Sequence, residues 1–176
     1  MTINFENLED VTRKYMRSEV NLDIGTDKIY YSRYLKDGLH ENWHALLLES
    51  INGNDDAWLE NQIKVNHMLI ENYQKRTPSG GVTTAKVPHT APQTLAEGEF
   101  NRFYCRALCA RAIDEKKKVE VYRGKLVAHS RSASDDMIGR VVEPEVLLND
   151  LRINIGVDTA LGLPAGPNSG LTIKLV

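Results

Sequence analysis

The stretch that decides the fold is LAEGEFNRFYCRALCARAID, residues 95–114, which predicts the longest helix of the chain. Thr94 and Glu97 stand three residues apart at its start, a spacing typical of a capping box at a helix N-terminus. Bulk for packing is supplied by Phe100, Phe103, Tyr104 and Leu108. A second face carries small residues, which favours close packing against a neighbouring element; these are Gly98, Asn101, Cys105, Cys109 and Ala112.

The only two cysteines of the chain, Cys105 and Cys109, lie four residues apart in this helix. Side chains at this spacing stack along one helix face, a geometry that does not suit the narrow Cβ requirements of a disulfide. We therefore predict two buried, reduced thiols, as is usual in the cytosol.

Shorter elements are predicted on both sides of the long helix. Apolar spacing indicates helices over residues 6–22 and 39–51, and a third that opens at Asp55-Asp56 and continues or restarts through Met68, Leu69 and Tyr73. Residues 76–93 form a long connection rich in Pro, Gly and Thr, with a candidate strand at Val82–Val87. After the long helix we predict a strand within 119–127, a helix from Pro144 to Leu151 and a strand over 171–176.

Together these elements predict an α+β fold, a predominantly helical single domain with a small sheet of short strands. The domain would span residues 1–176. Within it we expect a helical N-terminal lobe over 1–75, a loop over 76–93 and an α+β part over 94–176.

The composition is that of an ordinary globular protein. Of 176 residues, 41% are hydrophobic and 26% are charged, and the formal net charge is −2, which excludes a collagen-like or wholly disordered chain. No apolar run approaches the roughly 20 residues that a membrane-spanning helix needs, so no membrane partner is expected. The N-terminal MTINFENLEDVTRKYM lacks the basic and apolar parts of a secretory signal, which predicts a cytoplasmic location.

Positive charge is concentrated in one segment. Residues 102–140 hold ten Lys and Arg against five Asp and Glu, whereas the rest of the chain holds twelve against nineteen. Arginines bind phosphates and aromatic rings stack on bases, so this mixture is typical of a polyanion-binding surface. The candidate binding residues are Arg102, Arg106, Arg123, Lys125 and Arg131. The alternative interpretation is a set of internal ion pairs, in which Arg102 pairs with Glu99 on the same helix face and Arg106 pairs with an acidic neighbour elsewhere.

A metal-binding pattern occurs at His40-Glu41-Asn42-Trp43-His44, which is HExxH. On this string the sequence resembles the zinc metallopeptidases. The resemblance implies that His40 and His44 are zinc ligands and that Glu41 is the general base acting on the metal-bound water. A third ligand would come from Glu60, His67 or Glu71. The alternative is two histidines that flank an apolar helix stripe.

Two functions from different classes follow. The first is a non-enzymatic cytoplasmic binding or assembly module without a cofactor, whose partner is another protein, a second copy of the chain or a polyanion such as nucleic acid at segment 102–131. The alternative is a small zinc-dependent hydrolase that uses the HExxH string. The glycine-rich loops at 79–81 and 162–170 are further candidate binding surfaces.

Overall fold

The computed structural model of the chain describes residues 2–128, 130, 132–155 and 169–176. Its helices are α1 (Asp10–Gly25), α2 (His40–Ile51), α3 (Asp56–Val65), α4 (Ala91–Glu115), α5 (Ser132–Asp135) and α6 (Pro144–Ile153). Its strands are β1 (Asn72–Arg76), β2 (Val82–Lys86), β3 (Val119–Arg123), β4 (Val141–Val142) and β5 (Leu171–Leu175). The predicted α+β class, mainly helical with short strands, is confirmed.

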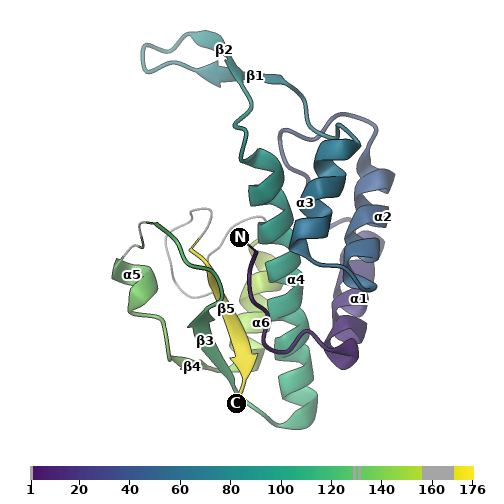
Figure 1. Cartoon of the computed structure of the whole chain (residues 1–176), viewed down its shortest axis with the longest axis vertical. Coiled ribbons are helices and arrows are strands. Elements are labelled where there is room, and N and C mark those ends of the chain that lie inside the picture. The colour runs from purple at the N-terminus through teal and green to yellow at the C-terminus, as the bar shows by residue number, and fades with distance from the viewer. Residues whose placement is uncertain (1, 129, 131, 156–168) are drawn as a thin grey trace.

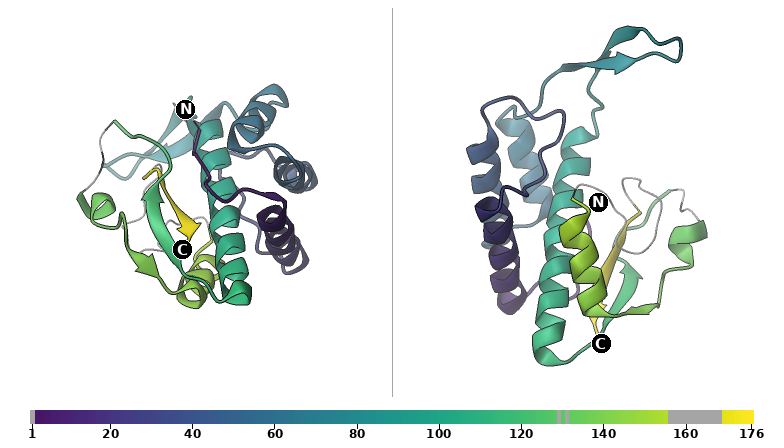
Figure 2. Two further views of the ribbon diagram at one scale, coloured as in Figure 1. Left: turned by 60° about the horizontal axis from the view of Figure 1, so that its bottom comes forward. Right: turned by 180° about the vertical axis from the view of Figure 1, so that it is seen from behind.

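Helix α4 is the centre of the molecule (Figure 1). Helices α1 and α3 pack on one side of it, while α6 and β5 pack on the other (Figures 1 and 2). Apolar side chains on several faces of α4 are fully buried, among them Phe100, Phe103, Tyr104, Leu108 and Ala112. Because full burial of a large apolar side chain stabilises a fold by about 1.5–3 kcal/mol, this one helix supplies much of the core.

The long helix begins four residues earlier than the sequence predicts. It opens at Ala91 with Pro92 in its first turn, where proline lacks an N–H that would have no intrahelical partner. The Thr94 N–H already donates to the Thr90 carbonyl at 2.9 Å, so Thr94 lies inside the helix and the predicted capping box does not form.

The third helix also differs from the prediction, because it ends at Val65 and does not continue to Tyr73. Asp55 caps its start by accepting a hydrogen bond from the Trp58 N–H at 2.8 Å. His67 has a φ of 48°, a left-handed conformation that redirects the backbone after the helix. Tyr73 therefore lies in strand β1.

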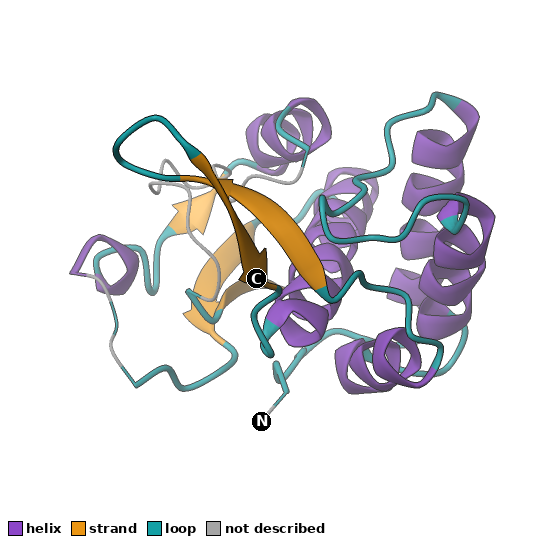
Figure 3. Cartoon of the chain, turned by 90° about the horizontal axis from the view of Figure 1, so that it is seen from above, coloured by secondary structure: helices purple, strands orange, loops and turns teal. Residues whose placement is uncertain are grey.

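The three-stranded sheet has the order β4-β3-β5 and is antiparallel throughout. It lies on the opposite side of α4 from α1, α2 and α3 (Figures 1 and 3). The outer edge of β5 is covered by side-chain amides: Asn101 Nδ2 donates to the Leu171 carbonyl and the Leu175 N–H donates to Asn7 Oδ1, both at 2.9 Å. This cover protects an edge that would otherwise offer free hydrogen-bonding groups to another strand.

The N-terminal residues 3–7 form a strap that crosses from the sheet to the helices. The Asn4 N–H donates to the Gly124 carbonyl at 2.8 Å, and the Tyr122 hydroxyl donates to the Asn4 carbonyl at 2.6 Å. At the other side, the Ile3 N–H donates to Asp56 Oδ2 at 3.2 Å. A Cβ on Gly124 would lie 2.8–2.9 Å from atoms of Ile3, Asn4 and Thr172, so only glycine allows this approach.

Strands β1 and β2 form a separate antiparallel hairpin that projects from the body beyond the N-terminal end of α4 (Figures 1 and 2). Its residues, 72–86, are exposed except for Tyr73, Thr77 and Ala85, which are half-buried. In the part of the chain that the structure describes, no helix is long and apolar enough to cross a membrane.

Candidate functional site

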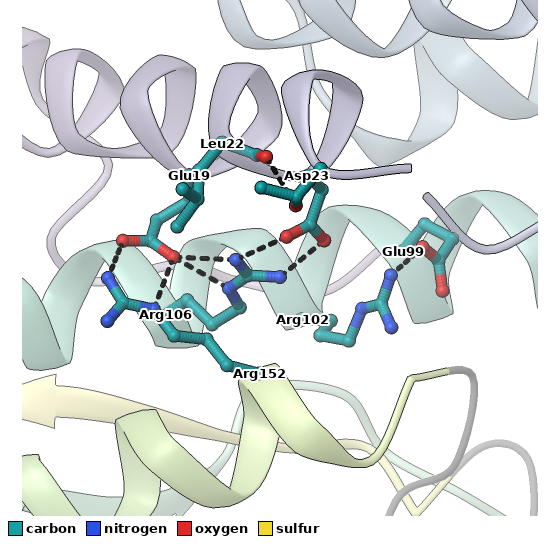
Figure 4. A network of polar contacts seen from close by, with 8 residues as sticks. Glu19, Leu22, Asp23, Glu99, Arg102, Arg106 and Arg152 are labelled. Atoms are coloured by element: carbon teal, nitrogen blue, oxygen red, sulfur yellow. Dashed lines mark hydrogen bonds and ion pairs between the residues drawn. The ribbon is translucent and has the colours of Figure 1, made fainter. Parts of the chain in front are cut away.

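Arg106, a candidate binding residue, lies in the interior with no exposed side chain and is ion-paired, as the alternative interpretation expects (Figure 4). Its Nη1 and Nη2 donate to the two carboxylate oxygens of Asp23 at 2.6 and 2.8 Å, and its Nε donates to Glu19 at 2.8 Å. Arg152 from α6 donates to Glu19 at 2.5 and 3.0 Å. Burial alone would raise the pKa of Glu19, but the hydrogen bonds and charges of Arg152 and Arg106 lower it. The ion pairs of Arg106 and Arg152 with Glu19 and Asp23 therefore connect helices α1, α4 and α6.

Arg102 is also buried, with 6% of its side chain exposed, and it pairs with Glu99 at 2.5 Å (Figure 4). Burial raises the pKa of Glu99 despite the nearby arginine charges. The Nε and Nη1 atoms of Arg102 are buried and have no hydrogen-bond partner among the residues that the structure describes. The pairing of Arg102 with Glu99 is the internal ion pair that the sequence left open as an alternative.

The remaining basic candidates are engaged near the surface. Arg123 pairs with Asp135 at 2.5 Å, and Lys125 pairs with the buried Glu97. Arg131 lies outside the described residues. The expected basic surface therefore does not form around Arg102 and Arg106, because both guanidinium groups are interior. A charge count along the sequence could not show this.

The HExxH residues lie on the first turns of α2 beside Tyr31. The Tyr31 ring stacks on His40 with centroids 3.9 Å apart and planes at 16°, and its hydroxyl lies 2.6 Å from His44 Nε2. Burial, followed by the charge of His40, lowers the pKa of His44. Tyr31 thus occupies the imidazole nitrogen that a shared metal ion would use.

The proposed third ligands are not brought to these histidines. Glu60 pairs with Lys64, His67 follows α3, and Glu71 lies at the base of the hairpin. Among the described residues, no three His, Cys, Asp or Glu side chains converge as a metal site would require.

Both cysteines are buried and reduced, as predicted. Burial raises the pKa of the Cys109 thiol, and the nearby Cys105 raises it further, which makes Cys109 unreactive. The Cys105 Sγ lies 3.5 Å from Asn101 Oδ1 and 3.7 Å from the Thr172 hydroxyl. These contacts pack α4 against β5.

The hairpin carries three exposed cations and no acidic residue. It contains Lys75, Arg76 and Lys86 and no Asp or Glu, whereas the rest of the chain has an excess of five acidic residues. In the described structure none of the three forms an ion pair within 4 Å. The register places Lys75 on one face with Tyr73, and Arg76 and Lys86 on the other. Both faces of the ribbon are therefore positive.

The tip of the hairpin is a turn that its own residues define. The Thr77 N–H donates to the Gly81 carbonyl at 2.8 Å, and the Gly81 N–H donates to the Thr77 hydroxyl at 3.0 Å. Gly80 has a φ of 84°, which favours glycine. The predicted glycine-rich loop at 79–81 is this tip. Of the second loop, 162–170, only residues 169 and 170 are described.

An aromatic cluster lies at the base of the hairpin and consists of Arg33, Tyr34 and Tyr73, called the Arg33 cluster below. The two tyrosine rings meet edge to face with centroids 5.1 Å apart. The Arg33 Cζ lies 4.8 Å from the Tyr34 centroid and 5.0 Å from the Tyr73 centroid, within the range of cation–π attraction.

Backbone pairing fixes this cluster to the body. The Ile70 N–H donates to the Tyr34 carbonyl and the Lys36 N–H donates to the Met68 carbonyl, both at 2.9 Å. Leu35 between them is buried in the core. Behind the hairpin base, a groove of ≈ 370 Å³ is lined by residues 69–72, 86–89 and Pro92.

Of the two hairpin strands, only β2 was predicted from the sequence. Strand Val82–Lys86 confirms the prediction at 82–87. Its partner was missed, although NYQKR and VTTAK flank the turn signal TPSGG, which is typical of a hairpin. The chain matches no protein-family model, no curated protein and no solved structure, so its own residues are the basis for inferring a function.

Proposed function

We propose that this chain is a non-enzymatic binding module that holds a polyanion with its β1–β2 hairpin. The observation that carries the proposal is the projecting ribbon, which has three exposed cations and no acidic residue. It packs on the body at its base, where the Tyr73 ring meets Tyr34. The proposal keeps the class of function predicted from the sequence and moves the contact from segment 102–131 to residues 72–86.

The chemistry of the ribbon suits phosphate or sulfate groups. Lysine and arginine supply the charge, while the exposed Thr83, Thr84 and backbone N–H groups of the free strand edges supply uncharged donors. In the described structure neither edge of this two-stranded ribbon pairs with a further strand, so these donors stay available for a partner. Binding of this kind is electrostatic and weakens as salt is added, because neutralised phosphates release counterions.

Glutamine in place of Lys75, Arg76 and Lys86 is expected to lower the affinity for a labelled heparin oligosaccharide at least about tenfold. For an oligonucleotide, three phosphate contacts correspond to a slope of log K against log salt of about −2, and the triple variant is expected to flatten it towards zero. Fluorescence anisotropy at several salt concentrations measures both quantities.

The matched control replaces Lys14, Lys28 and Lys116 with glutamine. These residues are exposed, lie outside the hairpin and form no ion pair within the described structure, so the net charge changes equally. Retained affinity in the control and loss in the hairpin variant support the proposal. Equal losses would assign the binding to net charge alone. No binding of the unmodified protein to either polyanion would overturn the proposal.

A further inference from the structure

We infer that the polyanion held by the hairpin is a single-stranded nucleic acid, with a base stacked on the Arg33 cluster and phosphates bound by the hairpin cations. This inference rests on the proposed function and names its ligand class. Two features carry it: a stacking surface at the base of the hairpin, and a cation on the same strand face as one of its rings.

The stacking surface is held in place before any ligand arrives. The Arg33 Nη2 donates to the Tyr34 hydroxyl at 2.6 Å, so this arginine is restrained over the tyrosine rings. Arg33 is exposed and pairs with no carboxylate among the residues described, while Tyr34 and Tyr73 are half-buried. Bases in single strands stack on aromatic rings and on guanidinium planes, and this cluster offers both.

The phosphate-binding charge lies close to this surface. Tyr73 and Lys75 are two residues apart on strand β1, so their side chains share one face of the ribbon. Ala85 and Thr83 are their partners on β2. Two residues along a strand correspond to about 7 Å, so Lys75 is placed next to the stacking surface in the direction of the tip. Base stacking and phosphate contact are thus available along one continuous face.

The same arrangement favours a single strand over the other polyanions. In a duplex the base faces are covered by neighbouring bases, so the Arg33 cluster would contribute only the charge of Arg33. An acidic protein would likewise use the cations and leave the rings without a role. The acidic remainder of the chain also disfavours a duplex that wraps onto the body.

The test compares three labelled ligands of about 20 units: oligo-dT, an abasic deoxyribose-phosphate strand of the same charge, and duplex DNA. Oligo-dT is expected to bind about tenfold more tightly than the abasic strand, because only the bases can stack. Valine in place of Tyr73 keeps a strand-forming residue and is expected to remove most of this preference, with abasic binding changed less than about twofold.

Leucine in place of Tyr15 is the matched control, because this half-buried tyrosine contacts Asp114 near the far end of α4. It is expected to preserve the preference for bases. Equal binding of oligo-dT and the abasic strand would overturn the stacking inference while the proposed polyanion function stands. Tighter binding of duplex DNA would overturn the choice of a single strand. If none of the three ligands binds and heparin also fails, the proposed function itself is wrong.

Discussion

Asparagine in place of Asp56 is expected to raise the free energy of unfolding at pH 7 by about 2 kcal/mol. Asp56 is 1% exposed, and its Oδ1 has no hydrogen-bond partner within the described part of the chain. Burial raises its pKa to about 6 in spite of the hydrogen bond from Ile3, and the charges of Asp55 and Glu97 add to the increase. At pH 7 the folded protein therefore contains an ionised carboxylate without a compensating cation. An amide keeps an oxygen for the Ile3 N–H and removes the charge.

The pH dependence identifies this cause. Because the pKa of Asp56 is higher in the folded protein than its ordinary value of 3.8, folding favours the protonated form. The contribution of Asp56 to stability is full below pH 3.8 and is lost as the pH rises through about 6. The advantage of the asparagine variant should accordingly grow over this window and be small below it.

Urea unfolding of both proteins from acid to neutral pH measures the difference in stability. Asparagine in place of the exposed Asp55 is the matched control, since it removes a neighbouring charge and preserves a good helix cap. This control should show no comparable gain. A variant of Asp56 that is less stable than the parent at pH 7 would contradict the interpretation.

Methionine in place of Arg106 is expected to lower the free energy of unfolding by about 3–5 kcal/mol, because it leaves buried carboxylates without their cation. Asp23 would lose its two charge-assisted hydrogen bonds, while Glu19 would keep only those from Arg152. The loss should shrink in acid, where the carboxylates take up protons. Chemical unfolding at two pH values checks both statements.

Two further variants separate the lost charge pairing from lost packing. Methionine in place of Arg152, whose side chain is 40% exposed, is expected to cost only about 1 kcal/mol. Leucine in place of Asp23 in the Arg106→Met background should recover much of the stability, because an apolar group then replaces the unpaired charge. A single Arg106→Met variant as stable as the parent would show that the buried pair contributes nothing net.

Helices with a strong apolar stripe could be predicted from the sequence. The predictions for 39–51 and 144–151 agree with α2 and α6 to within two residues. The long helix was found, although its start was placed at a capping motif rather than at Pro92. In these segments neighbouring residues along the chain determine the burial pattern, so local periodicity carries the information.

Strand β1 could not be recognised in this way. Neither face of the hairpin packs on the core, so the alternation of apolar and polar residues that reveals a strand is absent. Met68, Leu69 and Tyr73 stand at helical spacing by coincidence, and the first two face the body while Tyr73 joins the Arg33 cluster. The available indication of strand β1 was the turn signal TPSGG between the two short polar runs NYQKR and VTTAK.

The site residues could be predicted only in part, because their contacts join residues that are distant in sequence. Arg106 meets Glu19 and Asp23, which lie 87 and 83 residues earlier in the chain. A local charge count therefore could not decide whether these arginines bind a partner at the surface or form internal ion pairs. HExxH places two imidazoles on one helix face, but a third ligand depends on tertiary structure, and no candidate converges on them within the described residues.

The two ends of the hairpin meet where it leaves the body, since the Val87 N–H donates to the Glu71 carbonyl at 2.9 Å. Just outside these residues, Leu69 packs on the core and Pro92 lies in the first turn of α4, so we expect the ribbon to tolerate changes of length without a shift of the core. The entropic cost of closing such a loop rises only slowly with its length. The body can therefore keep its packing while the length of this arm, residues 72–86, changes.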